Sequence, residues 1–164
     1  MNLFYKLFQN RTSQETDIIA PISGKIMSIT TVPDEVFSKK IVGDGIAIQP
    51  SGNKIVAPVE GTIGTIFKTM HAFSIITKNE IEIFVHFGID TILLKGKGFK
   101  KIANENQKVN VGDTIIEYDL DFLTKKSKSV LTPIIISNVN QIKKIKKYSG
   151  QAIAGKTVIM KIIK

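Results

Sequence analysis

The sequence has 164 residues and contains no cysteine. Disulfide bonds and thiolate chemistry are therefore excluded, and we expect the protein in a reducing compartment, the cytoplasm. No apolar run is long enough to cross a bilayer, and polar residues interrupt the apolar ones in MNLFYKLFQN, so this stretch does not resemble a secretory signal. The length suits one domain with a sizeable hydrophobic core.

Arginine is nearly absent, since Arg11 is the only one, yet the formal net charge is +9 and the isoelectric point is near 9.7. The lysines are scattered, with small clusters in residues 95–101, 125–128 and 143–147. No aromatic residues alternate with them, as a stacking platform for nucleic acid would require. We therefore expect no nucleic-acid partner and interpret most of the lysines as a solvated surface.

Strand signals run through most of the chain. Short β-branched runs are separated by glycine, proline, asparagine and aspartate, and they read GKIMSI, GIAIQP, GTIGTIF, IEIFVHF, DTIIEY, TPIIIS and KTVIMKII. This pattern predicts an all-β protein, an antiparallel β-sandwich or barrel-like hybrid with a few short helices. The best helix candidates are residues 121–128, capped by Asp121, and residues 140–147. We expect a flexible tail over residues 1–17 and one domain over residues 18–164.

Histidine is scarce, and both copies lie in the stretch MHAFSIITKNEIEIFVHFGID, residues 70–90. A two-residue loop at Lys78 and Asn79 would make His71 face His86 across adjacent strands, with Cβ atoms roughly 4.5–5.5 Å apart. Alternation then places both histidines off the core. The core stripe on the other face would be Ile81, Ile83, Val85 and Phe87.

Two facing imidazoles favour their neutral forms, because adjacent positive charges repel each other. A serine hydrolase is disfavoured, since the sequence has no G-x-S-x-G motif. Three interpretations remain: ordinary half-buried histidines, a zinc hydrolase with His71, His86 and Asp90 as ligands, and phosphoryl transfer through histidine. In the last, one imidazole attacks phosphorus and the other stabilises the phosphoryl oxygens.

Several motifs resemble the glucose-type enzyme IIA phosphocarriers of the bacterial phosphoenolpyruvate:sugar phosphotransferase system. The resemblance covers the chain from Ile18 onward and is carried by KIVGDGIAIQPSGNKIVAPVEGTIGTIF, MHAFSI, FVHFGIDT, LKGKGF, VGDTIIEYDL and LTPIIISN. It implies an antiparallel β-sandwich with few, short helices. The basic charge of this chain departs from the acidic members of the family.

The resemblance implies a role for each residue around the histidine pair. His86 would accept a phosphoryl group on its outer nitrogen from the histidine-containing phosphocarrier protein and pass it to a cysteine of the IIB domain of a glucose-type sugar permease. His71 would donate a hydrogen bond to that group, Thr69 would support that side of the site, and the Gly88 carbonyl would hold the inner nitrogen of His86. No cofactor is required for the transfer, and a zinc ion at His71 and His86 would need a further ligand from a partner.

Transfer between two proteins also requires an exposed apolar face around the histidine. By resemblance, Asp34 and Asp90 would meet an arginine of the phosphocarrier. The apolar ring would consist of Val36, Phe37, Ile41, Val42, Phe67, Phe84 and Ile92. The alternative for each apolar member is ordinary core packing.

Further partners and a third class of function also follow from resemblances. The family implies glycerol kinase, adenylate cyclase and other sugar permeases as regulatory partners. The stretch VNVGDTII and an A-P-x-x-G repeat resemble turns of lipoyl and biotinyl carrier domains, but no lysine in the typical MKM or DKA setting is present.

The first residues suggest a contact with the inner face of the membrane. Leu3, Phe4, Leu7 and Phe8 would form one apolar stripe on a helix, and Lys6 and Arg11 add positive charge. We therefore expect a cytoplasmic protein held transiently near the membrane by this tail.

Overall fold

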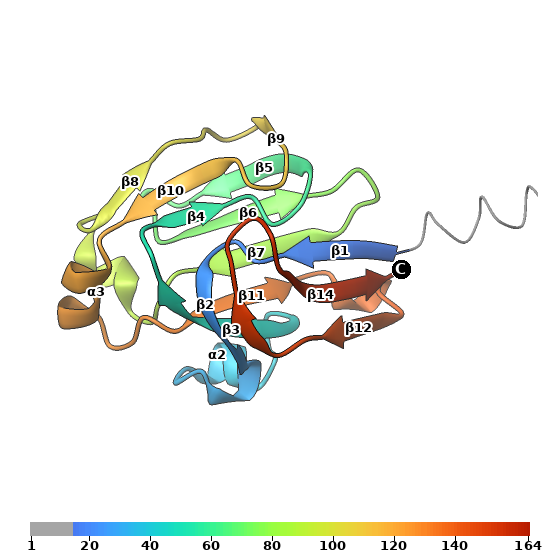
Figure 1. The fold of residues 1–164 in the computed structure, drawn as a ribbon, viewed down its shortest axis with the longest axis horizontal. Coiled ribbons are helices and arrows are strands. Elements are labelled where there is room, and N and C mark those ends of the chain that lie inside the picture. The colour runs from blue at the N-terminus through green and yellow to red at the C-terminus, as the bar shows by residue number, and fades with distance from the viewer. Residues whose placement is uncertain (1–14) are drawn as a thin grey trace, which may run out of the picture.

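Strands dominate residues 15–164, the part of the chain that the computed structural model describes (Figure 1). The strands are β1 (Glu15–Ile19), β2 (Ser23–Ser28), β3 (Asp44–Ser51), β4 (Lys54–Val56), β5 (Gly61–Ile66), β6 (Ala72–Ile76), β7 (Glu82–His86), β8 (Phe99–Lys101), β9 (Lys108–Val109), β10 (Thr114–Tyr118), β11 (Thr132–Ile136), β12 (Lys144–Lys147), β13 (Gly150–Ala152) and β14 (Val158–Ile163). The helices are η1 (Ile29–Thr31), α2 (Glu35–Ser38), η2 (Thr91–Leu94), α3 (Leu120–Lys126) and η3 (Val139–Gln141). The predicted all-β class with few, short helices is confirmed.

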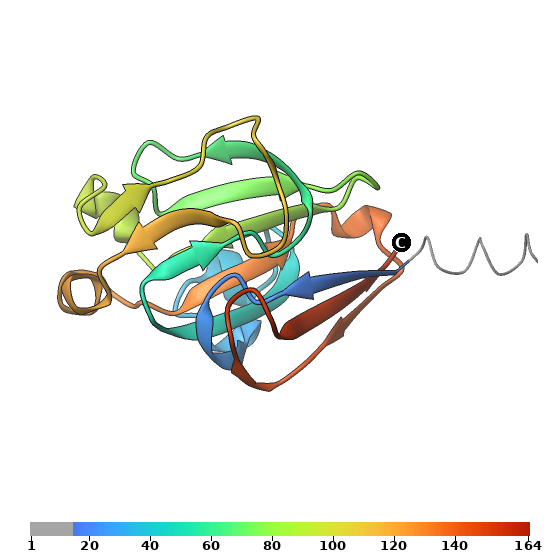
Figure 2. The ribbon, with the colours of Figure 1, turned by 45° about the horizontal axis from the view of Figure 1, so that its top comes forward.

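The strands of this part of the chain form antiparallel sheets. The largest has eight strands in the order β13-β2-β3-β11-β7-β6-β5-β9, and two three-stranded sheets have the orders β4-β10-β8 and β1-β14-β12. Figures 1 and 2 show β1, β14 and β12 side by side near the C-terminus, with α3 at the opposite end of the molecule. The large sheet places β6 and β7 among its inner strands; His86 is the last residue of β7, and His71 directly precedes β6.

The two faces of the large sheet bury different clusters. Ile83 and Val85 of β7 are fully buried in the main core, whereas Phe84 and His86 between and beyond them point to the other face and are half-buried. A smaller cluster covers that second face beneath η1 and α2 and consists of Ile29, Val32, Phe37, Ala47, Ile89, Leu131 and Ile135, with Met27 and Phe84 packed against it. The predicted core stripe of β7 is confirmed, and the second cluster supports the surroundings of His86.

The predicted tail of residues 1–17 overlaps β1. Thr16 lies opposite Ile162 and Asp17 opposite Lys161 in the ladder with β14. The Lys161 ammonium also lies 3.4 Å from a carboxylate oxygen of Glu15. These backbone and side-chain contacts make residues 15–17 part of the domain. The rest of the predicted tail, residues 1–14, lies outside the described residues.

The helix predictions were correct only in part. Helix α3 falls near residues 121–128, but its cap is Asp119, whose carboxylate accepts a hydrogen bond from the Phe122 amide at 3.0 Å, and Asp121 lies in the first turn. Residues 140–147 form the end of η3 and the strand β12, because β14 offers a free edge and Ile145 packs on the core. No helix within residues 15–164 combines the length and the hydropathy of a membrane-spanning segment.

Candidate functional site

The two histidines meet at one end of the β6–β7 hairpin. Their ring centroids are 4.7 Å apart and their planes are inclined by 84°. Phe37 lies 5.0 Å from His86 and Phe67 lies 5.3 Å from His71, centroid to centroid. The two imidazoles are therefore close together, as predicted, and aromatic rings flank them on both sides.

The hairpin loop differs from the predicted two-residue turn. Thr77 bonds to Ile81 across the loop, and Glu80 adopts the left-handed conformation with φ of 63°. A loop of this kind has three residues, the last of them left-handed. The predicted pair Lys78 and Asn79 lacks the glycine that favours a two-residue turn, and this absence is the physical reason for the longer loop.

The longer loop shifts the register by one residue. His86 lies opposite Ala72, not opposite His71 as predicted. His71 lies just before β6, after Met70 with φ of 59°, and its carbonyl oxygen accepts a hydrogen bond from the Phe87 amide at 2.6 Å. His71 is only 2% exposed, and its ring lies beside those of His86 and Phe67.

His86 has a defined tautomer. Its Nδ1 lies 2.8 Å from the Gly88 carbonyl oxygen. Because a carbonyl oxygen only accepts hydrogen bonds, Nδ1 carries the proton and Nε2 keeps its lone pair in the neutral ring. Burial lowers the pKa of His86, against the opposing effects of the Gly88 carbonyl and the negative charges of Asp34 and Asp90. The result is a neutral imidazole with a free outer nitrogen near neutral pH.

His71 is held by the hydroxyl group of Thr69. The Thr69 Oγ1 lies 2.7 Å from Nδ1 of His71. Burial, followed by the charge that His86 would carry, lowers the pKa of His71 from 6.5 to about 4. His71 is therefore neutral at physiological pH. If the Thr69 hydroxyl donates to Nδ1, the Nε2 of His71 carries the proton and acts as a hydrogen-bond donor.

The turn that presents the Gly88 carbonyl depends on glycine and on two buried threonines. Gly88 has φ of 67°, and a Cβ atom there would lie 2.6 Å from the Ser129 carbonyl oxygen. The Thr91 hydroxyl donates to the Phe87 carbonyl, and the Thr132 hydroxyl accepts from the Gly88 amide at 3.4 Å. Both threonines are fully buried. Sequence reasoning missed them, although FGIDT and LTP are among the motifs that carry the resemblance.

The predicted apolar ring is only partly exposed. Phe37 is 5% exposed and packs against His86, so the expectation of surface exposure was wrong for it, and Phe84 is half-buried. Phe37 is buried because α2 directs its side chain into the smaller cluster. Leu93, which sequence reasoning did not select, is 73% exposed. The exposed members are Val36, Ile41, Val42, Phe67 and Ile92.

The two predicted acidic residues flank the histidine from different elements. Asp34 caps α2, where its carboxylate accepts a hydrogen bond from the Val36 amide at 2.9 Å. Asp90 precedes η2 and has φ of 59°. Both carboxylates act electrostatically on His86, in the direction that favours its charged form.

The predicted zinc ligands do not form a metal site in the described residues. No group of three or more histidine, cysteine, aspartate or glutamate side chains is close enough to hold a metal ion within residues 15–164. His71 and His86 are adjacent, but Asp90 does not complete a set with them. A catalytic zinc site needs three protein ligands, so the zinc hydrolase alternative is not supported.

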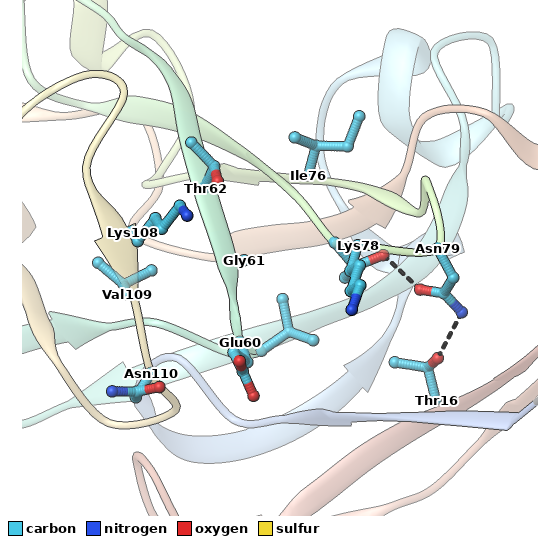
Figure 3. A pocket seen from close by; sticks show the side chains of 12 residues that line it. Thr16, Glu60, Gly61, Thr62, Ile76, Lys78, Asn79, Lys108, Val109 and Asn110 are labelled. Atoms are coloured by element: carbon cyan, nitrogen blue, oxygen red, sulfur yellow. Dashed lines mark hydrogen bonds between the residues drawn. The ribbon is translucent and has the colours of Figure 1, made fainter. Parts of the chain in front are cut away.

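A large cavity lies at the other end of the same hairpin (Figure 3). It has a volume of about 780 Å³, and its lining includes the apolar side chains of Ile76 and Val109. The Asn79 amide donates to the Thr16 hydroxyl at 3.2 Å along its rim. Neither histidine lines this cavity, so it is separate from the paired imidazoles.

The comparisons with known proteins agree with this geometry. The model of the family described as phosphoenolpyruvate-dependent sugar phosphotransferase system, EIIA 1, matches residues 16–142. The chain belongs to this family. The "PTS system glucose-specific EIIA component" of Buchnera aphidicola subsp. Acyrthosiphon pisum is 61% identical over 157 residues, 96% of each chain. The protein of the same name from Haemophilus influenzae is 57% identical over 166 residues, the full length of both.

A solved structure supports the same assignment. The glucose permease IIA from Mycoplasma capricolum superimposes with a TM-score of 0.85 at 38% identity, covering 90% of this chain and 96% of that one. As a member of the EIIA family, the chain is a phosphoryl carrier of the sugar phosphotransferase system. The lipoyl-type carrier alternative is not supported.

Proposed function

We propose that His86 is the residue that carries the phosphoryl group. It accepts the group from the histidine-containing phosphocarrier protein and passes it to a cysteine of the IIB domain of a glucose-type permease. The observation that carries this assignment is the hydrogen bond from Nδ1 of His86 to the Gly88 carbonyl at 2.8 Å. That bond leaves the Nε2 lone pair free to attack phosphorus.

Neither of the two phosphoryl transfers requires a cofactor. In the first, the Nε2–P bond forms as the N–P bond of the donor histidine breaks, and the bonding pair returns to the donor nitrogen. Phosphorylated His86 keeps its Nδ1 proton, so the ring is cationic and the Gly88 carbonyl stabilises it. In the second, the cysteine thiolate attacks phosphorus and the N–P pair returns to Nε2 of His86.

His71 stabilises the transferring group as a neutral donor. With the Thr69 hydroxyl donating to Nδ1, the Nε2–H of His71 can donate to a phosphoryl oxygen while the phosphorus moves between nitrogen and sulfur. Its low pKa, about 4, keeps the ring from taking up a proton and binding the phosphoryl group as an ion pair. Thr69 therefore sets the tautomer of His71, as Gly88 sets that of His86.

The exposed ring is the surface on which partners dock. Val36, Ile41, Val42 and Ile92 expose apolar area next to the segments that support His86, and a partner covering them excludes water from the transfer. Asp34 and Asp90 are placed to meet an arginine of the phosphocarrier. The same surface is the proposed contact for glycerol kinase, adenylate cyclase and other sugar permeases, and a partner ligand would complete a zinc site on the histidine pair.

The direct test is a labelling experiment. The protein is incubated with phosphoenolpyruvate, enzyme I and the phosphocarrier protein, and the labelled residue is mapped by mass spectrometry at alkaline pH. We expect an acid-labile, alkali-stable adduct on His86 and no labelling of His86→Ala. Label on serine, threonine or lysine would overturn the assignment. We further propose that the protein acts in the cytoplasm, where it meets these partners.

A further inference from the structure

The positive charge of the protein is confined to one part of the sequence. Up to Asp121 the chain has thirteen basic and fourteen acidic residues, whereas residues 122–164 contain ten lysines and no acidic residue. The whole net charge therefore comes from the last 43 residues. Uniform drift of composition would spread charge along the chain, so this separation calls for a structural explanation.

Some of these lysines line a notch between two segments that are far apart in the sequence. The notch has a volume of about 350 Å³ and lies between residues 40–44, which lead from α2 into β3, and residues 139–145. Its walls are formed by Lys40, Gly43, Asp44, Val139, Ile142, Lys143, Lys144 and Ile145. Three lysines thus face one space together with one carboxylate.

The single carboxylate in the notch is already in contact with two lysines. Asp44 lies 2.6 Å from the ammonium group of Lys147 and 3.6 Å from that of Lys40. Lys143 and Lys144 are exposed and form no ion pair within residues 15–164. The notch therefore has excess positive charge that the described part of the chain does not neutralise.

The notch continues the surface around His86. Ile41 and Val42, which are 67% and 40% exposed, belong to the loop whose neighbouring residues Lys40 and Gly43 line the notch. That loop follows α2, and Phe37 of α2 packs against His86. A protein that covers Ile41 and Val42 while it exchanges phosphoryl with His86 must also approach the notch.

We propose that the notch binds an acidic loop of the protein that docks on His86, with Lys40, Lys143 and Lys144 as the contacts. This inference rests on the proposed role of His86. Exposed ammonium groups beside an apolar docking surface steer an oppositely charged partner into register and raise its association rate. Lysines on an edge strand also prevent unwanted strand pairing, but Lys40 and Lys143 lie outside any strand. A concave, partly apolar site fits a protruding loop better than a flat lipid surface.

The test compares two charge reversals in the full-length protein. The variant K143E/K144E changes the notch, and K100E/K101E makes the same change of charge on exposed lysines of β8, in a different sheet. Second-order rates of phosphoryl transfer are measured from the phosphocarrier protein to His86 and from His86 to the IIB domain, both from the same organism, over a range of salt concentrations. Circular dichroism confirms that each variant is folded, and K143Q/K144Q replaces the reversal if it is not.

We expect K143E/K144E to slow at least one of the two transfers about tenfold at low salt and to reduce the salt dependence of that rate, while K100E/K101E stays within about twofold of wild type. Equal rates for K143E/K144E and wild type in both transfers would overturn the proposal. So would an effect confined to binding of anionic phosphatidylglycerol vesicles, which would assign the lysines to a membrane surface. The final extent of His86 labelling, which should not change, reports separately on the carrier function.

Discussion

The Nδ1 of His86 donates its proton to the carbonyl oxygen of Gly88, two residues further along the chain, at 2.8 Å. The backbone carbonyl of Gly88 therefore controls the tautomer of the His86 ring. The position of this carbonyl depends in turn on the geometry of the turn at Gly88.

His71→Gln should separate acceptance of the phosphoryl group from its delivery. Glutamine can donate a hydrogen bond from a similar position, but it does not reproduce the geometry of the imidazole in the transition state. We expect near-normal labelling of His86 and a loss of about 10²-fold in the rate of transfer to the IIB domain, the usual effect of removing one stabilising donor. Rapid-quench kinetics of both steps would measure this, and equal delivery by variant and wild type would contradict it.

Gly88→Ala should cost more stability than the same change at a comparable glycine. Gly88 has φ of 67° and would place a Cβ atom 2.6 Å from the Ser129 carbonyl oxygen, whereas Gly112 has φ of 89° and no atom within 4 Å of that position. Both variants suffer backbone strain of about 1 kcal/mol, but only Gly88→Ala adds a clash that must move the turn. Urea unfolding should show the larger loss for Gly88→Ala, together with slower phosphoryl transfer. Equal losses of stability would mean that the turn absorbs the added atom.

Thr132→Val should change the tautomer balance of His86 indirectly, through the backbone of Gly88. The Thr132 hydroxyl accepts from the Gly88 amide and donates to the Val130 carbonyl at 2.9 Å. Valine has the same shape but leaves both buried backbone groups without that partner, at a cost of about 1–3 kcal/mol.

The decisive measurement for Thr132→Val is the nitrogen NMR spectrum of His86. We expect a larger fraction of the Nε2–H tautomer and a lower transfer rate, both restored by Thr132→Ser. A destabilised variant with an unchanged tautomer would limit Thr132 to a structural role.

The sequence predicted the two-residue period of β7 because burial of alternate side chains depends only on local pattern. Ile83 and Val85 point into the core and His86 points away, as expected. The register of the hairpin was missed, since it depends on the left-handed conformation of Glu80, a residue type that rarely adopts it. The two imidazoles are nevertheless adjacent, because His71 lies just before the first residue of β6 and is not held in the β6–β7 ladder.

Contacts between distant segments were beyond prediction from local patterns. The support of Gly88 by Thr132 joins residues 44 positions apart, and the burial of Phe37 depends on α2 folding over the sheet. The family resemblance identified Gly88 and Phe37 as site residues, but only the packing explains how they act. The excess of lysine in residues 122–164 was visible in the sequence. The notch that some of these lysines line became apparent only because residues 139–145 fold next to residues 40–44.

Stability should fall as the pH drops through the range in which His71 titrates in the unfolded chain. Its pKa is 6.5 in the ordinary state and about 4 when folded, so between these values the unfolded chain binds more protons and unfolding becomes easier. Lowering the pH from about 7 to about 5 should cost about 2 kcal/mol through this group. Urea unfolding of wild type and His71→Gln at the two pH values isolates the effect, since the variant lacks this titration. Parallel losses in the two proteins would show that His71 is not the group responsible.

The N-terminal segment should assist transfer of the phosphoryl group to a membrane-bound permease and should not affect phosphorylation of His86. In MNLFYKLF, Leu3, Phe4, Leu7 and Phe8 would form one apolar stripe on a helix, which is too short to be stable in water but gains apolar burial and lysine–lipid attraction on an anionic bilayer. Deleting residues 1–10 leaves β1, which begins at Glu15, intact. We therefore expect unchanged phosphorylation by the soluble phosphocarrier and slower delivery to a permease in anionic vesicles, with no difference in neutral vesicles. Equal delivery by the truncated protein, or a peptide that stays non-helical on anionic lipid by circular dichroism, would exclude this role.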